Sequence, residues 1–206
     1  MPSPLRIAII VASIRPNRFA DNPLAWLLEQ TATRNEFDFE VIDLREHPLP
    51  NFDLATPPSV TPREYGTAAE RALGERLDAA DGYIVLTNEY NHSFSGALKN
   101  ALDHFFVEFN RKPIAFVGYG NVGGARAIEQ LRLVIDELDM ASVRPTVNIL
   151  GAHVMAIRAE HQDPSIVLAP LVPRLDLLLA DLHWWTATLK RGREMDKEST
   201  DASDDA

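Results

Sequence analysis

Residues 82–100 read GYIVLTNEYNHSFSGALKN. The first five, 82–86, form a short apolar run that is typical of a buried strand, and the apolar spacing after Gly96 is typical of a helix. Between the two lies a polar turn that carries the aromatic residues Tyr90 and Phe94. Because open α/β sheets bind their ligands where strands end, this turn is a candidate binding loop.

Two further turns have the same position, directly after an apolar strand. Ser-Ile-Arg-Pro-Asn-Arg at 13–18 follows the run 5–12, and the glycine-rich segment 118–124 follows the run 114–117. The carboxyl ends of parallel strands meet at one edge of a sheet. We therefore expect the three turns to form a single crevice.

The remainder of the chain alternates between the two kinds of pattern. Strands are predicted at 5–12, 39–44, 82–86, 114–117 and within 143–150, and helices from Asn22-Pro23 and over 63–77, 96–106, 124–138 and 173–189. Such alternation predicts an α/β fold, a parallel sheet with helices on both faces. We expect one domain over 1–192 and, because 193–206 are acidic and lack apolar anchors, a disordered tail there.

The composition excludes several classes of function. The 206 residues carry a net charge of −10 and no cysteine, which argues against nucleic-acid binding and removes disulfides, thiol catalysis and thiolate metal sites. The six histidines lack metal-ligand spacing, so no metal is expected. No apolar run approaches the ~20 residues of a membrane span. The start lacks a signal-peptide pattern, so we expect a cytoplasmic protein with no membrane partner.

The turn at 13–18 is rich in donors for an anion. Ser13, Arg15 and Arg18 precede a helix start, where a phosphate monoester is readily held, although the arginines are also typical of an ordinary charged surface. The segment 118–124 matches G-x-G-x-x-G, a dinucleotide fingerprint, but the next strand ends without the expected carboxylate. Its glycines fit close approach to a flat ligand better, with plain packing as the alternative.

The three turns together resemble the NAD(P)H-dependent FMN reductase family, which includes quinone, azo-dye and chromate reductases. The resemblance covers roughly 5–150 and rests on Ser13-x-Arg15-x-x-Arg18, on 89–103, and on Gly120-x-x-Gly123-Gly124-Ala125-Arg126. It implies a flavodoxin-like three-layer sandwich whose five-stranded parallel sheet has the order 2-1-3-4-5. It also implies an oxidoreductase with FMN as cofactor and NADPH or NADH as electron donor.

The resemblance assigns roles to individual residues. The FMN phosphate would be bound by Ser13, Arg15 and Arg18. The isoalloxazine and ribityl parts would be contacted by Glu89, Tyr90, Asn91 and Ser93, and the glycine-rich turn would lie along the ring through Tyr119, Gly120, Val122 and Gly123. No side chain is expected to be catalytic, because N5 of the flavin accepts the hydride.

The expected reaction is hydride transfer from the nicotinamide to bound FMN, followed by electron delivery to a second acceptor in a ping-pong cycle. The acceptor is a small molecule: free flavin or, alternatively, a quinone, azo compound or chromate. A non-enzymatic flavodoxin-type electron carrier is another alternative. A domain that has lost its flavin is a third, because Ala12, Asn88 and Ser95 replace a glycine and two prolines of the family pattern.

A homodimer or homotetramer is expected from the same resemblance. Phe105, Phe106 and Phe109 give one predicted helix more apolar surface than a single inward face needs. Excess apolar surface of this kind is typical of a subunit interface.

Overall fold

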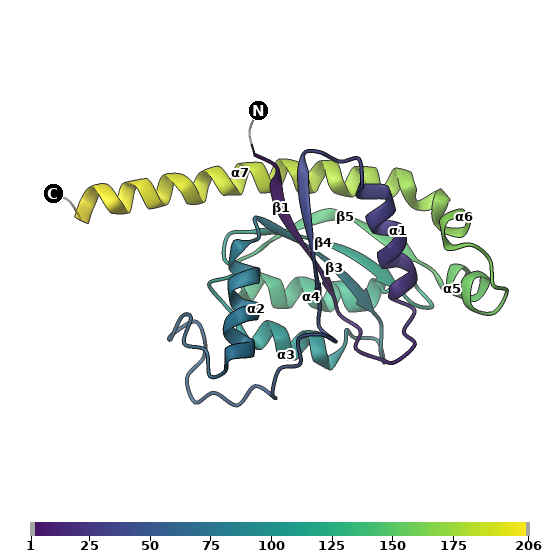
Figure 1. Cartoon of the computed structure of the whole chain (residues 1–206), viewed down its shortest axis with the longest axis horizontal. Coiled ribbons are helices and arrows are strands. Elements are labelled where there is room, and N and C mark those ends of the chain that lie inside the picture. The colour runs from purple at the N-terminus through teal and green to yellow at the C-terminus, as the bar shows by residue number, and fades with distance from the viewer. Residues whose placement is uncertain (1–2, 205–206) are drawn as a thin grey trace.

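A five-stranded parallel sheet forms the centre of the computed structural model, which describes residues 3–204, with side chains to residue 199 (Figure 1). Its strands are β1 (Leu5–Val11), β2 (Phe37–Asp43), β3 (Gly82–Asn88), β4 (Pro113–Tyr119) and β5 (Ala141–Ile149). They pair in the order β2-β1-β3-β4-β5, and every pair is parallel. The predicted fold class and strand order are confirmed.

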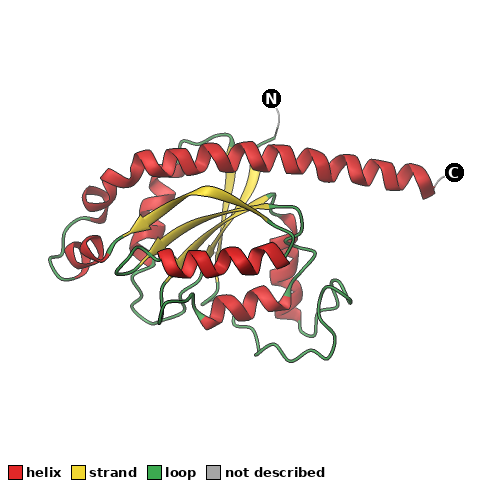
Figure 2. Cartoon of the chain, turned by 180° about the vertical axis from the view of Figure 1, so that it is seen from behind, coloured by secondary structure: helices red, strands yellow, loops and turns green. Residues whose placement is uncertain are grey.

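Helices cover both faces of the sheet. One face carries α1 (Asp21–Thr31) and α7 (Val172–Asp204); the other carries α2 (Ala68–Ala79), α3 (Gly96–His104) and α4 (Ala125–Glu137). Figure 2 shows the second set from behind, below the long helix α7. Between β5 and α7 the chain forms α5 (Gly151–Arg158), α6 (Pro164–Leu168) and a short 3-10 turn (Ala169–Leu171), which the sequence patterns did not predict.

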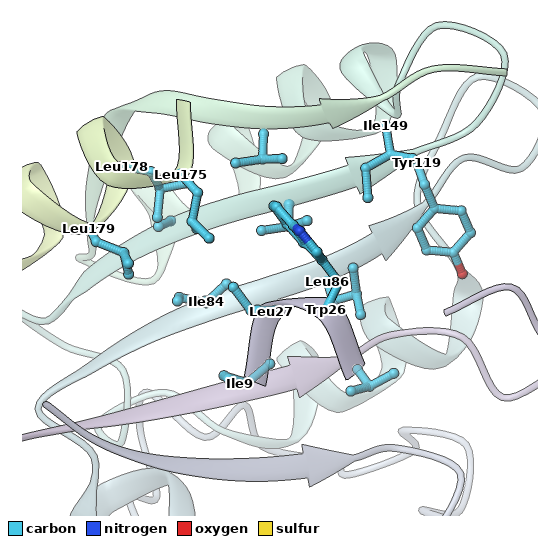
Figure 3. Close-up of a cluster of buried hydrophobic side chains, with 14 of the residues drawn as sticks. Ile9, Trp26, Leu27, Ile84, Leu86, Tyr119, Ile149, Leu175, Leu178 and Leu179 are labelled. Atoms are coloured by element: carbon cyan, nitrogen blue, oxygen red, sulfur yellow. The ribbon is translucent and has the colours of Figure 1, made fainter. Parts of the chain in front are cut away.

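Two apolar cores lie against the two faces. In the first, Trp26 and Leu27 of α1 and leucines of α7 pack on Ile84 and Leu86 of β3 (Figure 3). In the second, α2, α3 and α4 pack on the opposite side chains of the same strands. All seven residues of β3 are therefore buried, which explains why this strand reads as an unbroken apolar run.

Two predicted helix starts were wrong. Helix α1 begins at Asp21, and Asn22 is not its cap. Helix α2 begins at Ala68, five residues after the predicted start at Arg63, because Thr67 caps it: its hydroxyl accepts from the Glu70 N–H, and the Glu70 carboxylate accepts from the Thr67 N–H. This reciprocal capping box fixes the start of α2 and leaves residues 63–67 in the irregular connection.

The apolar surface expected on α3 is used inside the chain. Helix α3 ends at His104, and Phe105 and Phe109 are each 1% exposed. Their rings lie 6.0 Å from the ring of Tyr65 and 5.4 Å from that of Tyr83, respectively. Two of the three phenylalanines are therefore used inside the chain, whereas Phe106 is half-buried, and the expected oligomeric state stays a prediction.

The described part of the predicted disordered tail, 193–204, is helical, as the end of α7. Figure 1 shows α7 running past the edge of the sheet. Arg193 lies 3.5 Å from an Asp81 carboxylate oxygen and donates to the Arg111 carbonyl oxygen, while Asp196 pairs with Arg111. These contacts attach the start of the segment to the body of the domain; residues 205–206 lie outside the described residues. No helix of residues 3–204 has the length and apolarity that crossing a membrane requires.

Candidate functional site

Three loops meet at the carboxyl edge of the sheet: loop 1 (residues 12–20), loop 2 (residues 89–95) and loop 3 (residues 120–124). The Ser13 and Tyr90 hydroxyl oxygens, from loops 1 and 2, are 3.4 Å apart. A Cβ atom added to Gly120 in loop 3 would lie 3.4 Å from the Glu89 Cβ in loop 2. The three turns therefore adjoin at the carboxyl edge of the sheet, as expected, and the surface between them is called the crevice below.

Loop 1 presents unpaired hydrogen-bond donors. Among the described residues, the backbone N–H groups of Ile14, Arg15 and Asn17 have no acceptor. Asn17 adopts a left-handed conformation (φ 50°), and α1 begins four residues later without a side-chain cap. The exposed Arg15 guanidinium lies 5.9 Å from the centre of the Tyr90 ring. Free amides beside a helix N-terminus, together with one free guanidinium, match the donor set that a phosphate requires.

The Arg18 side chain is directed inward. Its Nη1 donates to an Asp43 carboxylate oxygen at 2.7 Å and to the Ser13 carbonyl oxygen at 2.5 Å, and its Nε donates to Asp21 at 2.8 Å. Burial opposes ionisation of Asp43, but the hydrogen bonds from Arg18 and the Arg45 N–H outweigh it and lower the pKa of Asp43. The buried Arg18 side chain thus stabilises the conformation of loop 1, while the Arg15 guanidinium is exposed beside Tyr90. Nothing in the local sequence could reveal this pairing, because Asp43 lies on another strand.

Loop 2 is a tight turn of fixed geometry. Tyr90 and Ser93 exchange two backbone hydrogen bonds, of 2.8 and 2.9 Å, across Asn91 and His92. Both central residues are left-handed, with φ of 50° and 70°. This is the pattern of a type I′ turn. It holds Asn91 exposed and Tyr90 half-buried at the crevice.

Two predicted ligands in loop 2 face helix α4. Glu89, whose side chain is 5% exposed, accepts hydrogen bonds from Nε and the backbone N–H of Arg126, at 2.6 and 3.3 Å. The Ser93 hydroxyl donates to Gln130 at 2.6 Å. These contacts hold loop 2 against the start of α4. Arg126 was not among the predicted site residues, although its place directly after the glycine-rich turn was a usable signal.

The glycines of the 118–124 segment have different tasks. A Cβ atom on Gly123 would lie 2.6 Å from the Asn148 Cβ, and one on Gly118 would lie 2.5 Å from the Gly123 carbonyl oxygen. These two glycines are required for internal packing. Gly120 has no such obstacle, and the neighbouring Val122 is 41% exposed. Gly120 and Val122 therefore border the crevice, whereas Gly123 supports loop 3 against β5.

Tyr119 and Asn88, the paired last residues of β4 and β3, lie buried at the strand ends from which loops 3 and 2 leave the sheet. The Tyr119 ring packs on Phe19 (Figure 3 shows its hydroxyl group beyond the core). Burial raises the pKa of Tyr119 to about 12, against the opposing effect of a hydrogen bond with Ser13. Asn88 is 2% exposed, and neither atom of its amide has a hydrogen-bond partner among the described residues. Buried amides are normally paired, so this unpaired amide is an exception.

Comparison of the sequence with known proteins assigns the chain to a protein family. The model of the NADPH-dependent FMN reductase family matches residues 5–153. The chain belongs to this family.

Relatives include the NAD(P)H-dependent FMN reductase C4B3.06c of Schizosaccharomyces pombe, 34% identical over 145 residues, which span 70% of this chain and 72% of that protein. The FMN-dependent NADPH-azoreductase of Staphylococcus aureus is 32% identical over 133 residues, 63% of this chain and 69% of that protein. Among solved structures, the flavoenzyme NAD(P)H:(acceptor) oxidoreductase FerB of Paracoccus denitrificans shares the fold, with a TM-score of 0.67 and 21% identity over 88% of this chain and 97% of that one.

Membership confirms the predicted family, the class of oxidoreductase, and FMN with NADPH or NADH as cofactors. The contacts that individual residues make with FMN stay predictions.

Proposed function

We propose that this FMN reductase family member binds FMN in the crevice of loops 1, 2 and 3 and oxidises NADPH or NADH there. The observation that carries the proposal is the set of acceptor-free N–H groups in loop 1 beside the exposed Arg15. A protein seldom leaves so many adjacent donors unpaired unless water or a ligand satisfies them. A phosphate monoester provides the needed acceptors at one point.

The side chains divide into two groups in this proposal. Arg15 and the loop 1 amides would hold the phosphate, and the Ser13 hydroxyl would border it. Tyr90, Asn91, Tyr119, Gly120 and Val122 would line the ribityl chain and the ring. Four other predicted residues would act by positioning, through the contacts described above: Arg18, Glu89, Ser93 and Gly123.

Bound FMN would supply the redox chemistry, with hydride uptake from the nicotinamide and electron delivery to a second acceptor in a ping-pong cycle. The protein would orient the ring and stabilise charge on it. The backbone N–H groups of Asn121 and Val122, directly after Gly120 in loop 3, have no acceptor among the described residues. Fixed amide donors of this kind stabilise negative charge without reorganising. No proton transfer by a side chain is required.

The acceptor belongs to the same proposal. The relative from Staphylococcus aureus is named an azoreductase, so azo compounds are candidate acceptors here, beside free flavins and quinones. A cytoplasmic location and a homo-oligomeric state are retained as predictions.

Anaerobic mixing tests the function. The purified protein is loaded with FMN, freed of excess flavin and mixed with NADPH or NADH. Prompt loss of the yellow colour is expected. Persistent colour with both nucleotides would favour a flavodoxin-type carrier, and failure to retain FMN would favour a domain that has lost its cofactor. For the ping-pong order, initial rates at several fixed acceptor concentrations should give parallel double-reciprocal lines; intersecting lines contradict it.

A further inference from the structure

Asn88 is a buried amide without a partner. Its side-chain nitrogen and oxygen both lack hydrogen bonds among the described residues, and the residue is 2% exposed. Leaving both a donor and an acceptor unpaired in a protein interior is costly. Such a group is therefore expected to have a partner that the chain alone does not supply.

The position of Asn88 connects it to the crevice. Alternation along β3 places Asn88 on the same face as Leu86, which belongs to the core beneath α1. On one side its register partner is Tyr119. On the other side loop 1 begins, held by a 3.0 Å hydrogen bond from the Ala12 N–H to the Leu86 carbonyl oxygen. The amide thus lies at the end of β3, where loop 1 and Tyr119 adjoin.

The chemistry of the two unpaired atoms narrows the ligand. A phosphate group accepts hydrogen bonds and would leave the amide oxygen of Asn88 unsatisfied. A hydroxyl group both donates and accepts, so it can pair with either amide atom. We infer that Asn88 binds hydroxyl groups of the ribityl chain of FMN. This inference rests on the proposed function.

The residue type adds to the argument. The family pattern has a proline at position 88, and a proline side chain offers no hydrogen bond. Asn88 therefore gives this chain a polar contact that the pattern lacks. Both amide atoms are buried in the ligand-free chain, so the inference includes a side-chain rearrangement at the crevice when the flavin binds.

The test compares Asn88→Leu, which keeps the size of the side chain and removes both polar atoms, with the unchanged protein. Without flavin, the urea midpoint of unfolding is expected to stay equal or rise, because an unpaired amide has been removed. The dissociation constants of FMN and riboflavin should both increase about tenfold, as expected for two neutral hydrogen bonds. Lumiflavin, which carries a methyl group in place of the ribityl chain, should bind with unchanged affinity.

Asn110→Leu is the matched control. The Asn110 amide donates to the Phe106 and Leu138 carbonyl oxygens, at 3.1 and 2.9 Å. Its replacement should lower the urea midpoint and leave FMN affinity unchanged. Asn88→Ala is a second variant that avoids added bulk, and it should weaken FMN and riboflavin in the same way.

Three results separate the possibilities. Unchanged FMN affinity in both Asn88 variants overturns the inference alone. A lower urea midpoint of Asn88→Ala and Asn88→Leu, comparable to that of Asn110→Leu, also overturns it, because the amide would then have a structural partner. If the unchanged protein binds no FMN, the proposed function itself fails, and this inference fails with it.

Discussion

The Ser95 hydroxyl group donates a 2.8 Å hydrogen bond to the Ala12 carbonyl oxygen and thereby joins the start of α3 to the end of β1. The Ser95 hydroxyl oxygen also accepts a 3.2 Å hydrogen bond from the Leu98 N–H and thereby caps α3. One side chain thus secures loop 1 and loop 2 together. A proline, which the family pattern has at this position, could make neither bond.

Ser95→Ala should lower the free energy of unfolding by about 1–2 kcal/mol, because it removes a helix cap and leaves the Ala12 carbonyl oxygen unpaired. Urea denaturation measures this change. Ser199→Ala is the control. Ser199 is exposed near the end of α7, so this substitution should change the free energy of unfolding by no more than about 0.5 kcal/mol. Equal stability of the two variants would contradict the role of Ser95.

The two arginines of loop 1 should differ in what their removal changes. Arg15→Ala should weaken FMN binding about tenfold, leave riboflavin binding unchanged and preserve stability, since Arg15 is exposed and its proposed partner is the phosphate. Arg18→Met should lower the free energy of unfolding by about 3–5 kcal/mol, because it removes the buried guanidinium that pairs with the Asp43 carboxylate. Flavin titration and urea denaturation separate the two effects. Similar stability losses in both variants would refute this division.

Gly123 should tolerate no side chain. Gly123→Ala places a Cβ atom 2.6 Å from the Asn148 Cβ, at a left-handed φ of 68°, and we expect a loss of at least about 2 kcal/mol of stability. Gly192→Ala offers the opposite case. Gly192 lies in α7 with nothing within 4 Å of an added Cβ, so that variant should gain up to about 1 kcal/mol. Thermal unfolding of both variants decides the point; a stable Gly123→Ala protein would show that loop 3 is not packed against β5.

Lys112 should make stability depend on alkaline pH. Burial lowers the pKa of its ammonium group to about 8, and its Nζ donates to the Leu77 and Asp78 carbonyl oxygens at the end of α2. Between about pH 8 and the ordinary lysine value of 10.5, the unfolded chain binds more protons than the folded one. Stability from this group therefore rises with pH across that window.

The measurement is the difference in unfolding free energy between the unchanged protein and Lys112→Met. Between pH 8 and pH 10.5 this difference should change in favour of the protein with the lysine, by at most about 3.5 kcal/mol, since one pH unit corresponds to about 1.4 kcal/mol. The neutral amine keeps two N–H donors for the two carbonyls. A difference that does not vary with pH would show that Lys112 titrates normally.

The sheet could be predicted because its strands are buried on both faces. A strand such as β3 must be apolar throughout, and its ends are marked by polar turns. Helix starts were less predictable where a cap lies outside the apolar stripe, as Thr67 does. The irregular linkage from β5 to α7 was missed because α5 and α6 are short and only Ile157 and Leu168 of their residues are buried.

The site was predictable at the level of loops rather than of side chains. From the local sequence, Arg15 and Arg18 are equally good candidates for a phosphate ligand. Only Asp43, on strand β2, shows that the Arg18 guanidinium is buried in an ion pair while that of Arg15 stays exposed. The same holds for Glu89, whose partner Arg126 lies beyond the next strand. Long-range pairing decides which polar groups remain free, and a single sequence does not record it.

The left-handed pair Asn91 and His92 has a consequence for the energetics of association. Loop 2 already has its backbone fixed by the Tyr90–Ser93 hydrogen bonds before any flavin arrives. Preorganisation of this kind spares the complex most of the entropic penalty of ordering a loop. Loop 2 should therefore keep its backbone conformation when flavin binds, with little change in amide hydrogen exchange across residues 90–93.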